Sequence, residues 1–209
     1  MKYLKLFESF EDIDEICKEY NIIDYVVNKD VSIDVNGCVD LYNIGLTKLP
    51  LKFNKVNDGF YCEKNKLTSL EGSPIEVNGH FYCHNNYLTS LEGSPKEVNG
   101  SFYCHNNELT SFKFSPKIIR GNFDCEYNNI KSFEYFPSFV KCCFYCGDNP
   151  IYEVWKLFGD LNKIELLNDF DIFRDEDTDT PGVVMDRLND FLLTIGKDSV
   201  EKVYGYKNI

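Results

Sequence analysis

The residues best suited to acid–base or metal chemistry in this 209-residue chain are its three histidines. His84 and His105 stand 21 residues apart, and Glu63 and Glu126 occupy the preceding and following positions of the same series. Imidazole nitrogens and carboxylate oxygens are ordinary zinc ligands, so His84 and His105 could share an ion with one of the glutamates. Identical residues at a fixed interval also arise when a segment is duplicated. We therefore predict no resident metal and no cofactor, and keep a metal-binding protein as an alternative.

Nine cysteines are the second chemical group, and five of them follow the same interval: Cys62, Cys83, Cys104, Cys125 and Cys146. A straight row of thiols cannot bring four sulfurs to about 2.3 Å from one ion. Parallel neighbouring side chains also do not converge to the Cβ separation that a disulfide needs. We interpret the row as reduced, buried small hydrophobes and predict Cys143 as the one exposed thiol. With no phosphate-binding glycine loop, nucleophile elbow or zinc-protease helix, the predicted function is non-enzymatic.

A tyrosine series precedes the cysteines by one residue: Tyr61, Tyr82, Tyr103 and Tyr145. Strands of a parallel sheet lie about 4.8 Å apart, so these rings would stack along the sheet. Rigid amphipathic rings are enriched at protein interfaces, which favours a binding surface. Cross-strand ring contacts also stabilise a sheet that binds nothing, so a purely stabilising ladder stays open.

These residues belong to units of 21 residues, at 46–66, 67–87, 88–108, 109–129 and 130–150, with a degenerate first unit before Leu46. The shared pattern is L-x-x-L-x-x-x-P-x-x-V-x-G-x-F-x-C-x-x-N-x. Phe and Cys two positions apart predict a strand with both side chains inside, one parallel strand in each coil of a solenoid. The Asn column is predicted to satisfy backbone groups where the strand ends: Asn65, Asn86, Asn107, Asn128 and Asn149.

The sequence Phe81-x-Cys83-x-x-Asn86-x-Leu88-x-x-Leu91 resembles the strand signature of leucine-rich repeats, with Phe and Cys at two Leu positions. This resemblance implies an α/β repeat solenoid with a mostly extended convex side, and a concave face formed by residues flanking the buried strand positions. The sequence motifs LTSLEGSP and GxFYCxNN also resemble those of an uncharacterised group of repeat proteins encoded by bacteriophages. That resemblance implies a phage product but supplies no activity.

Three regions are predicted. Residues 1–30 form an N-terminal helical cap, with an amphipathic helix at 7–20; residues 31–150 form about six coils; and residues 151–209 form a C-terminal helical cap. Trp155 and Phe158 are expected to close the last coil, and a second cap helix is expected at 183–195. The aspartates between Asp169 and Asp179 invite a calcium interpretation, but the helix-flanked loop with its central Gly and closing Glu is missing.

The net charge of −12 is unevenly distributed. Residues 46–150 hold 11 Lys+Arg and 11 Asp+Glu, whereas residues 1–45 hold 4 against 10 and residues 151–209 hold 7 against 13. Because affinity for nucleic acid comes mostly from neutralised phosphates, an acidic chain without a basic cluster predicts no nucleic-acid partner. No apolar run approaches the roughly 20 residues that span a bilayer, and no secretory signal begins the chain, so we expect a cytoplasmic protein without membrane contact.

Together these patterns predict a non-enzymatic scaffold that binds a protein partner through a concave Tyr/His face, in the host cytoplasm if the chain is phage-encoded. The partner would then be a host or virion protein. The alternatives are a virion-associated structural protein that assembles with itself and, third, the metal-binding protein above. The predicted contact residues are Tyr61, Tyr82, Tyr103, Tyr145, Glu63, His84, His105 and Glu126.

Overall fold

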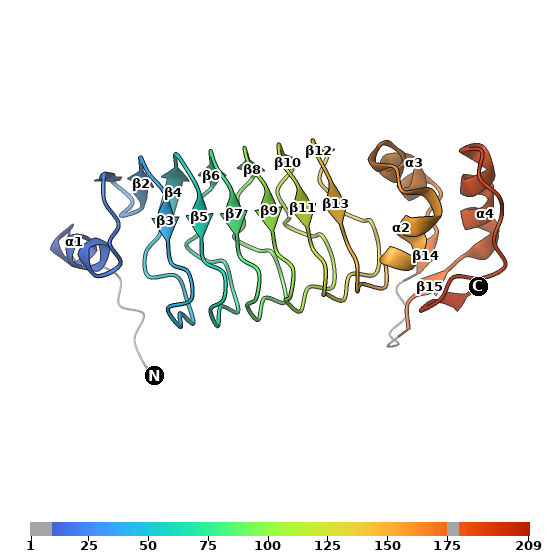
Figure 1. Cartoon of the computed structure of the whole chain (residues 1–209), viewed down its shortest axis with the longest axis horizontal. Coiled ribbons are helices and arrows are strands. Elements are labelled where there is room, and N and C mark those ends of the chain that lie inside the picture. Colours follow the sequence, from blue (N-terminus) through green and yellow to red (C-terminus); the bar gives the residue numbers. More distant parts are fainter. Residues whose placement is uncertain (1–9, 175–179) are drawn as a thin grey trace.

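The computed structural model describes residues 10–174 and 180–209. It is an α/β protein in which short parallel strands stack into two long sheets, with few helices, an arrangement compatible with a solenoid (Figure 1). The sequence predicted one strand in each 21-residue unit. The structure instead has two, because the segment that carries the Val column also pairs with its neighbours.

The first sheet has seven strands, of which β1 alone is antiparallel to its neighbour. In spatial order they are β1 (Tyr25–Val27), β2 (Ile33–Val35), β4 (Phe53–Val56), β6 (Glu76–Val77), β8 (Glu97–Val98), β10 (Ile118–Ile119) and β12 (Phe139–Val140). The second sheet has six parallel strands. These are β3 (Val39–Asp40), β5 (Phe60–Tyr61), β7 (Phe81–Tyr82), β9 (Phe102–Tyr103), β11 (Phe123–Asp124) and β13 (Phe144–Tyr145).

The register of the six-stranded sheet pairs residues 21 positions apart, as in Phe81 with Phe102 and Tyr82 with Tyr103. Backbone hydrogen bonding continues past the strand ends, since the Cys83 amide donates to Tyr103 O and the Asn85 amide to His105 O. The segment from the Phe column to the His column is therefore extended in each coil, and alternate side chains point to opposite faces.

The core confirms the predicted inward columns. The Phe and Cys columns are buried throughout, and Phe60, Phe81 and Phe102 stack at ring-centroid distances of 5.4 and 5.5 Å. The Val column is buried from Val56 to Ile119, but Val140 in the last coil is only partly buried. Glycine is needed where coils touch: a Cβ on Gly100 would lie 2.6 Å from Gly79 O.

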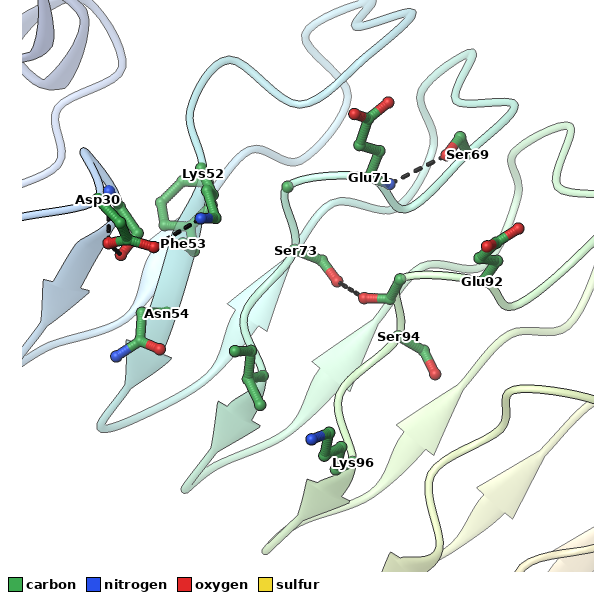
Figure 2. Close-up of a pocket in the computed structure, with 14 residues that line it drawn as sticks. Asp30, Lys52, Phe53, Asn54, Ser69, Glu71, Ser73, Glu92, Ser94 and Lys96 are labelled. Atoms are coloured by element: carbon green, nitrogen blue, oxygen red, sulfur yellow. Dashed lines mark hydrogen bonds and ion pairs between the residues drawn. The ribbon is translucent and has the colours of Figure 1, made fainter.

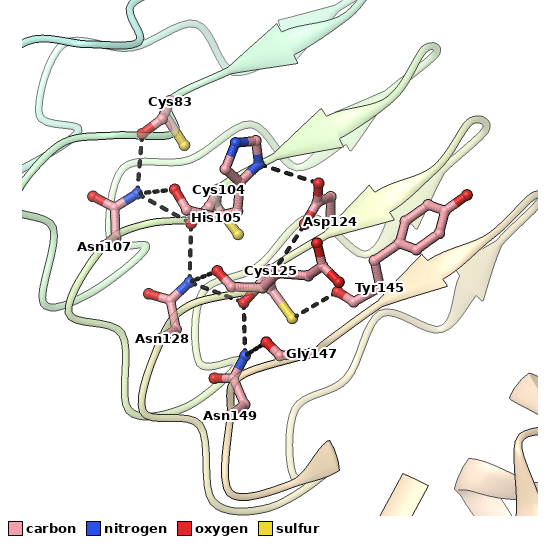
Figure 3. A network of polar contacts seen from close by, with 11 residues as sticks. Cys83, Cys104, His105, Asn107, Asp124, Cys125, Asn128, Tyr145, Gly147 and Asn149 are labelled. Carbon is pink, nitrogen blue, oxygen red and sulfur yellow. Dashed lines mark hydrogen bonds and ion pairs between the residues drawn. The ribbon is translucent and has the colours of Figure 1, made fainter. Parts of the chain in front are cut away.

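The asparagine column forms the predicted ladder (Figure 3). Asn86 is 6% exposed; its side-chain amide donates to Cys62 O at 3.0 Å and Cys83 O at 3.1 Å, and its Oδ1 accepts from the Leu67 amide at 2.9 Å. Each bond to the earlier coil ties two coils together. The same arrangement recurs at Asn65, Asn107, Asn128 and Asn149.

The ends of the stack are covered by helices, as predicted for α1 (Phe10–Glu19) and α2 (Tyr152–Phe158); residues 7–9 of the predicted first helix lie outside the described residues. Trp155 packs on Phe144 at 5.1 Å and Phe158 on Phe133 at 5.8 Å, measured between ring centroids, so both rings close the last coil. Among the described residues, no helix combines the length and apolar character required to cross a bilayer.

The C-terminal region is less helical than predicted. It contains η1 (Leu161–Lys163), α3 (Ile164–Asp169) and α4 (Met185–Thr194), together with a small sheet of β14 (Phe173–Arg174), β15 (Gly182–Val183) and β16 (Lys207–Asn208). The helix expected at 183–195 begins later because residues 182–183 pair with both neighbouring strands. Of the aspartates weighed as calcium ligands, Asp175, Asp177 and Asp179 lie outside the described residues.

Candidate functional site

The predicted contact residues lie on the outward side of the six-stranded sheet. Phe81 and Cys83 point inward and are fully buried, so the alternate residues Tyr82 and His84 point outward. We call this surface the Tyr/His face. It consists of Asp40, Tyr61, Tyr82, Tyr103, Asp124 and Tyr145 and, two residues further along each coil, Tyr42, Glu63, His84, His105, Glu126 and Gly147.

Aromatic rings form a continuous cluster at the centre of this face. Tyr82 and Tyr103 stack with centroids 4.7 Å apart and planes 2° from parallel. Tyr61 meets Tyr82 edge-on at 5.3 Å, and its phenol lies over Gly59, where a side chain would collide with it. These three tyrosines are half-buried, and burial raises the pKa of Tyr61 and Tyr82.

The two histidines stack beside the tyrosines, with ring centroids 4.2 Å apart and planes 22° from parallel. Burial, and the neighbouring His105, lower the pKa of His84 to about 4, so its imidazole is neutral at pH 7. His105 Nδ1 lies 3.1 Å from Asp124 Oδ2, an ion-pair distance without hydrogen-bond geometry (Figure 3). Asp124 was not among the predicted contact residues. Its place in the tyrosine column, on the coil after His105, is the sequence feature that could have indicated its position beside His105.

The stacking of His84 and His105 argues against a shared metal ion. The lone pairs of an imidazole lie in the ring plane, so two nearly parallel rings do not direct them at one point. Within residues 10–174 and 180–209, no group of three or more His, Cys, Asp or Glu side chains is arranged to hold a metal ion.

Glu63 is the most deeply buried charged group of the face, with 8% of its surface exposed. Burial raises the pKa of its carboxyl group, and the nearby Asp40 raises it further. The positive charge of Lys64 opposes this shift and lowers the Glu63 pKa, while Lys64 Nζ is hydrogen-bonded to Tyr42 Oη at 3.2 Å and lies over the Tyr42 ring.

Three polar side-chain atoms in the described part of the chain are shielded from solvent and lack a hydrogen-bond partner: Glu63 Oε2, His84 Nδ1 and His105 Nδ1. All three belong to one column of the Tyr/His face, on three successive coils. His105 Nδ1 still has the Asp124 carboxylate beside it, whereas Glu63 Oε2 and His84 Nδ1 are unpaired, and an unpaired buried polar atom costs about 1–3 kcal/mol.

The remaining predicted contact residues are less closely grouped. Tyr145 is 41% exposed, and the Asp124 strand separates it from Tyr103. A hydrogen bond with the Cys143 thiol raises the pKa of the Tyr145 phenol. Glu126 leans away from His105 and lies over Gly147, where a Cβ would sit 2.8 Å from its Oε1.

A third outward column has a mainly structural role. The Ser101 amide donates to His80 Nδ1 at 3.0 Å, and the Asn122 amide donates to Ser101 Oγ at 3.1 Å. The Cys143 amide then donates to Asn122 Oδ1 at 3.1 Å. His80 is therefore fixed by the backbone of the next coil, although its ring also lies 5.6 Å from that of Tyr82.

The prediction of a single exposed thiol was wrong. Cys38 and Cys142 are exposed as well as Cys143. The Cys column is buried, and that burial raises the thiol pKa at all of its positions, which keeps these sulfurs in the unreactive thiol form.

A groove of about 610 Å³ runs along the turns that follow the Leu columns (Figure 2). Its lining includes Lys52, Glu71, Ser73, Glu92 and Lys96, so it carries charges of both signs. The columns of the repeat did not predict this groove. Its signal was the Glu-Gly-Ser-Pro sequence repeated at 71–74 and 92–95, in which the glycines adopt φ +91° and +92°.

Comparison of the chain with models of protein families, with curated proteins and with solved structures gives no match.

Proposed function

We propose that this chain is a leucine-rich-repeat-like solenoid that acts as a non-enzymatic scaffold and binds a protein partner through the Tyr/His face. One observation carries the proposal. A continuous row of half-buried rings, Tyr61, Tyr82 and Tyr103 with His84 and His105 beside them, lies on the outward side of a parallel sheet. Rigid aromatic side chains of this kind bury much apolar area on binding and lose little conformational entropy.

The chemistry of the face supports binding in preference to catalysis. His84 is a weak base because its pKa is lowered to about 4, and it has no hydrogen-bonded nucleophile beside it. The buried Cys column lies on the other side of the strand from the histidines. A general base needs a pKa near the working pH and a partner within hydrogen-bond reach, and His84 has neither.

The sequence of the repeats resembles that of phage-encoded repeat proteins. We therefore propose a host or virion protein as the partner. Affinity capture from the native host tests the binding proposal, with wild type compared with the double variant Tyr82→Ala/Tyr103→Ala. We expect the partner to be captured by the wild type and lost with the double variant.

The matched control is Tyr87→Ala/Tyr204→Ala, which removes two tyrosines that are 53% and 64% exposed outside the Tyr/His face. This control should retain the partner. Capture of the same partner by the Tyr82→Ala/Tyr103→Ala variant, with its fold intact by circular dichroism, would reject the Tyr/His face as the binding surface.

A further inference from the structure

The two columns of the Tyr/His face carry an excess of negative charge, and the nearby Lys64 is hydrogen-bonded to Tyr42. The two columns hold four carboxylates, Asp40, Glu63, Asp124 and Glu126, and neither Lys nor Arg. This contrasts with the outward side of the seven-stranded sheet, where Lys55 pairs with Glu76 at 2.9 Å and Arg120 with Glu97 at 2.6 Å. Charges on that sheet are paired with Lys or Arg within the chain, whereas the ion pair described on the Tyr/His face joins Asp124 to His105 at 3.1 Å.

The carboxylates are placed at the two ends of the aromatic cluster. Asp40 and Glu63 lie before the Tyr82–Tyr103 stack, and Asp124 and Glu126 lie after it. Glu63 and Glu126 are three strands apart, which corresponds to roughly 14 Å at the usual spacing of about 4.8 Å between strands. Along the direction in which the coils stack, the face therefore presents two carboxylates, then the aromatic rings, then two further carboxylates.

The burial of Glu63 is a second observation that points to a cationic ligand, and it does not depend on the number of charges. The residue as a whole is more than nine-tenths buried, and its Oε2 is shielded from solvent without a hydrogen-bond partner. A guanidinium group satisfies such an oxygen with a charge-assisted hydrogen bond, and its flat face stacks on tyrosine rings. An ammonium group offers the charge but neither the fork geometry nor the stacking.

We propose that the Tyr/His face recognises a basic, extended protein segment that carries two arginines four residues apart and an apolar residue midway between them. In an extended chain, residues i, i+2 and i+4 point the same way, and i and i+4 are about 13–14 Å apart. One arginine would meet Glu63 and Asp40, the apolar residue would lie on Tyr82 and Tyr103, and the second arginine would meet Asp124 and Glu126. This inference rests on the proposed binding function and names the chemistry of the partner.

Synthetic peptides with the full chain test this inference directly. The probe is a fluorescent peptide with the core Arg-Ser-Leu-Ser-Arg. Its controls are the same peptide with both arginines replaced by glutamate and one with the arginines three residues apart. Fluorescence polarisation should show saturable binding of the probe, at least about tenfold weaker binding of the three-residue spacing, and none of the glutamate peptide. Equal binding of the two arginine spacings would overturn the proposed geometry.

Variants then locate the binding. Glu63→Gln keeps the shape of the side chain and should weaken the probe about tenfold, because it removes a charge-assisted partner. Its thermal unfolding midpoint should be unchanged or higher, since an unpaired buried carboxylate is replaced by a neutral amide. Loss of binding with unimpaired stability would distinguish recognition from a structural role. The control Glu76→Gln, on the other sheet, should bind as the wild type does.

The capture experiment and the peptide experiment can fail separately. A host partner that depends on Tyr82 and Tyr103 but whose contact segment lacks basic residues would leave the binding function standing and refute the arginine inference. Undetectable binding of the arginine probe, or binding that Glu63→Gln leaves unchanged, would also refute it.

Discussion

Replacing Asn86 by alanine is expected to lower the free energy of unfolding by about 2–4 kcal/mol. The Leu67 amide would lose its only acceptor, the Asn86 Oδ1, at a buried position, which costs about 1–3 kcal/mol. The carbonyls of Cys62 and Cys83 would each keep one hydrogen bond from a neighbouring asparagine. Losing the bond from the Asn86 amide therefore costs less, about 0.5 kcal/mol at each carbonyl.

Thermal unfolding followed by circular dichroism measures this loss. For a domain of this size, about 1 kcal/mol corresponds to about 2–4 °C, so the midpoint should fall by about 4–16 °C. The matched control is Asn78→Ala, which removes exposed bonds to Asn57 at 3.1 Å and Asn99 at 2.9 Å and should cost less than about 1 kcal/mol. Similar midpoints for the Asn86→Ala and Asn78→Ala variants would refute the argument.

A second variant separates the two halves of the asparagine's role. Asn86→Asp retains an oxygen for the Leu67 amide but places a carboxylate against the Cys62 and Cys83 carbonyls. Protonation of that carboxylate would restore one donor. The gap in stability between this variant and the wild type should therefore be smaller at pH 4 than at pH 7; a constant gap would show that the donors are unimportant.

Three further predictions follow from the described contacts. His84 takes up a proton near pH 6.5 when unfolded but only near 4 when folded, so stability should fall as the pH is lowered from about 6.5 to 4. Denaturant titrations of His84→Gln should show a weaker pH dependence over that window, and an unchanged one would contradict the assignment. Gly100→Ala should lower the unfolding midpoint because its Cβ would lie 2.6 Å from Gly79 O, whereas Gly37→Ala, with no atom within 4 Å, should not. With a thiol reagent, Cys38, Cys142 and Cys143 should react in the native protein and the other six cysteines only after unfolding; a fast-reacting column cysteine would contradict the buried column.

The sequence predicted the parts of the fold that depend on local periodicity. Phe and Cys two positions apart define an inward face, and the Asn three positions after the Cys lies where the extended segment ends, so the buried columns and the ladder could be inferred. The seven-stranded sheet was missed because each of its coils contributes only two to four residues, with one Val-type residue as the apolar signal. Its pairing is set by contacts with the neighbouring coil.

Features that depend on distant contacts could not be predicted. The C-terminal sheet includes the polar pair Lys207–Asn208, which carries no strand signal, and Tyr206 is held by a bond to Lys131 O, 75 residues earlier in the chain. On the Tyr/His face the periodicity indicated which residues point outward. It could not show that Glu126 leans over Gly147 or that Glu63 is buried, because those directions depend on the side chains of adjacent coils.

We propose that a protein partner contacts the Tyr/His face. Site-specific photo-crosslinking tests this most directly, with a photoreactive amino acid placed either at Tyr103 or, on the other sheet, at Glu97. We expect a crosslinked partner from position 103 and none from position 97. Crosslinking from position 97 alone would contradict it.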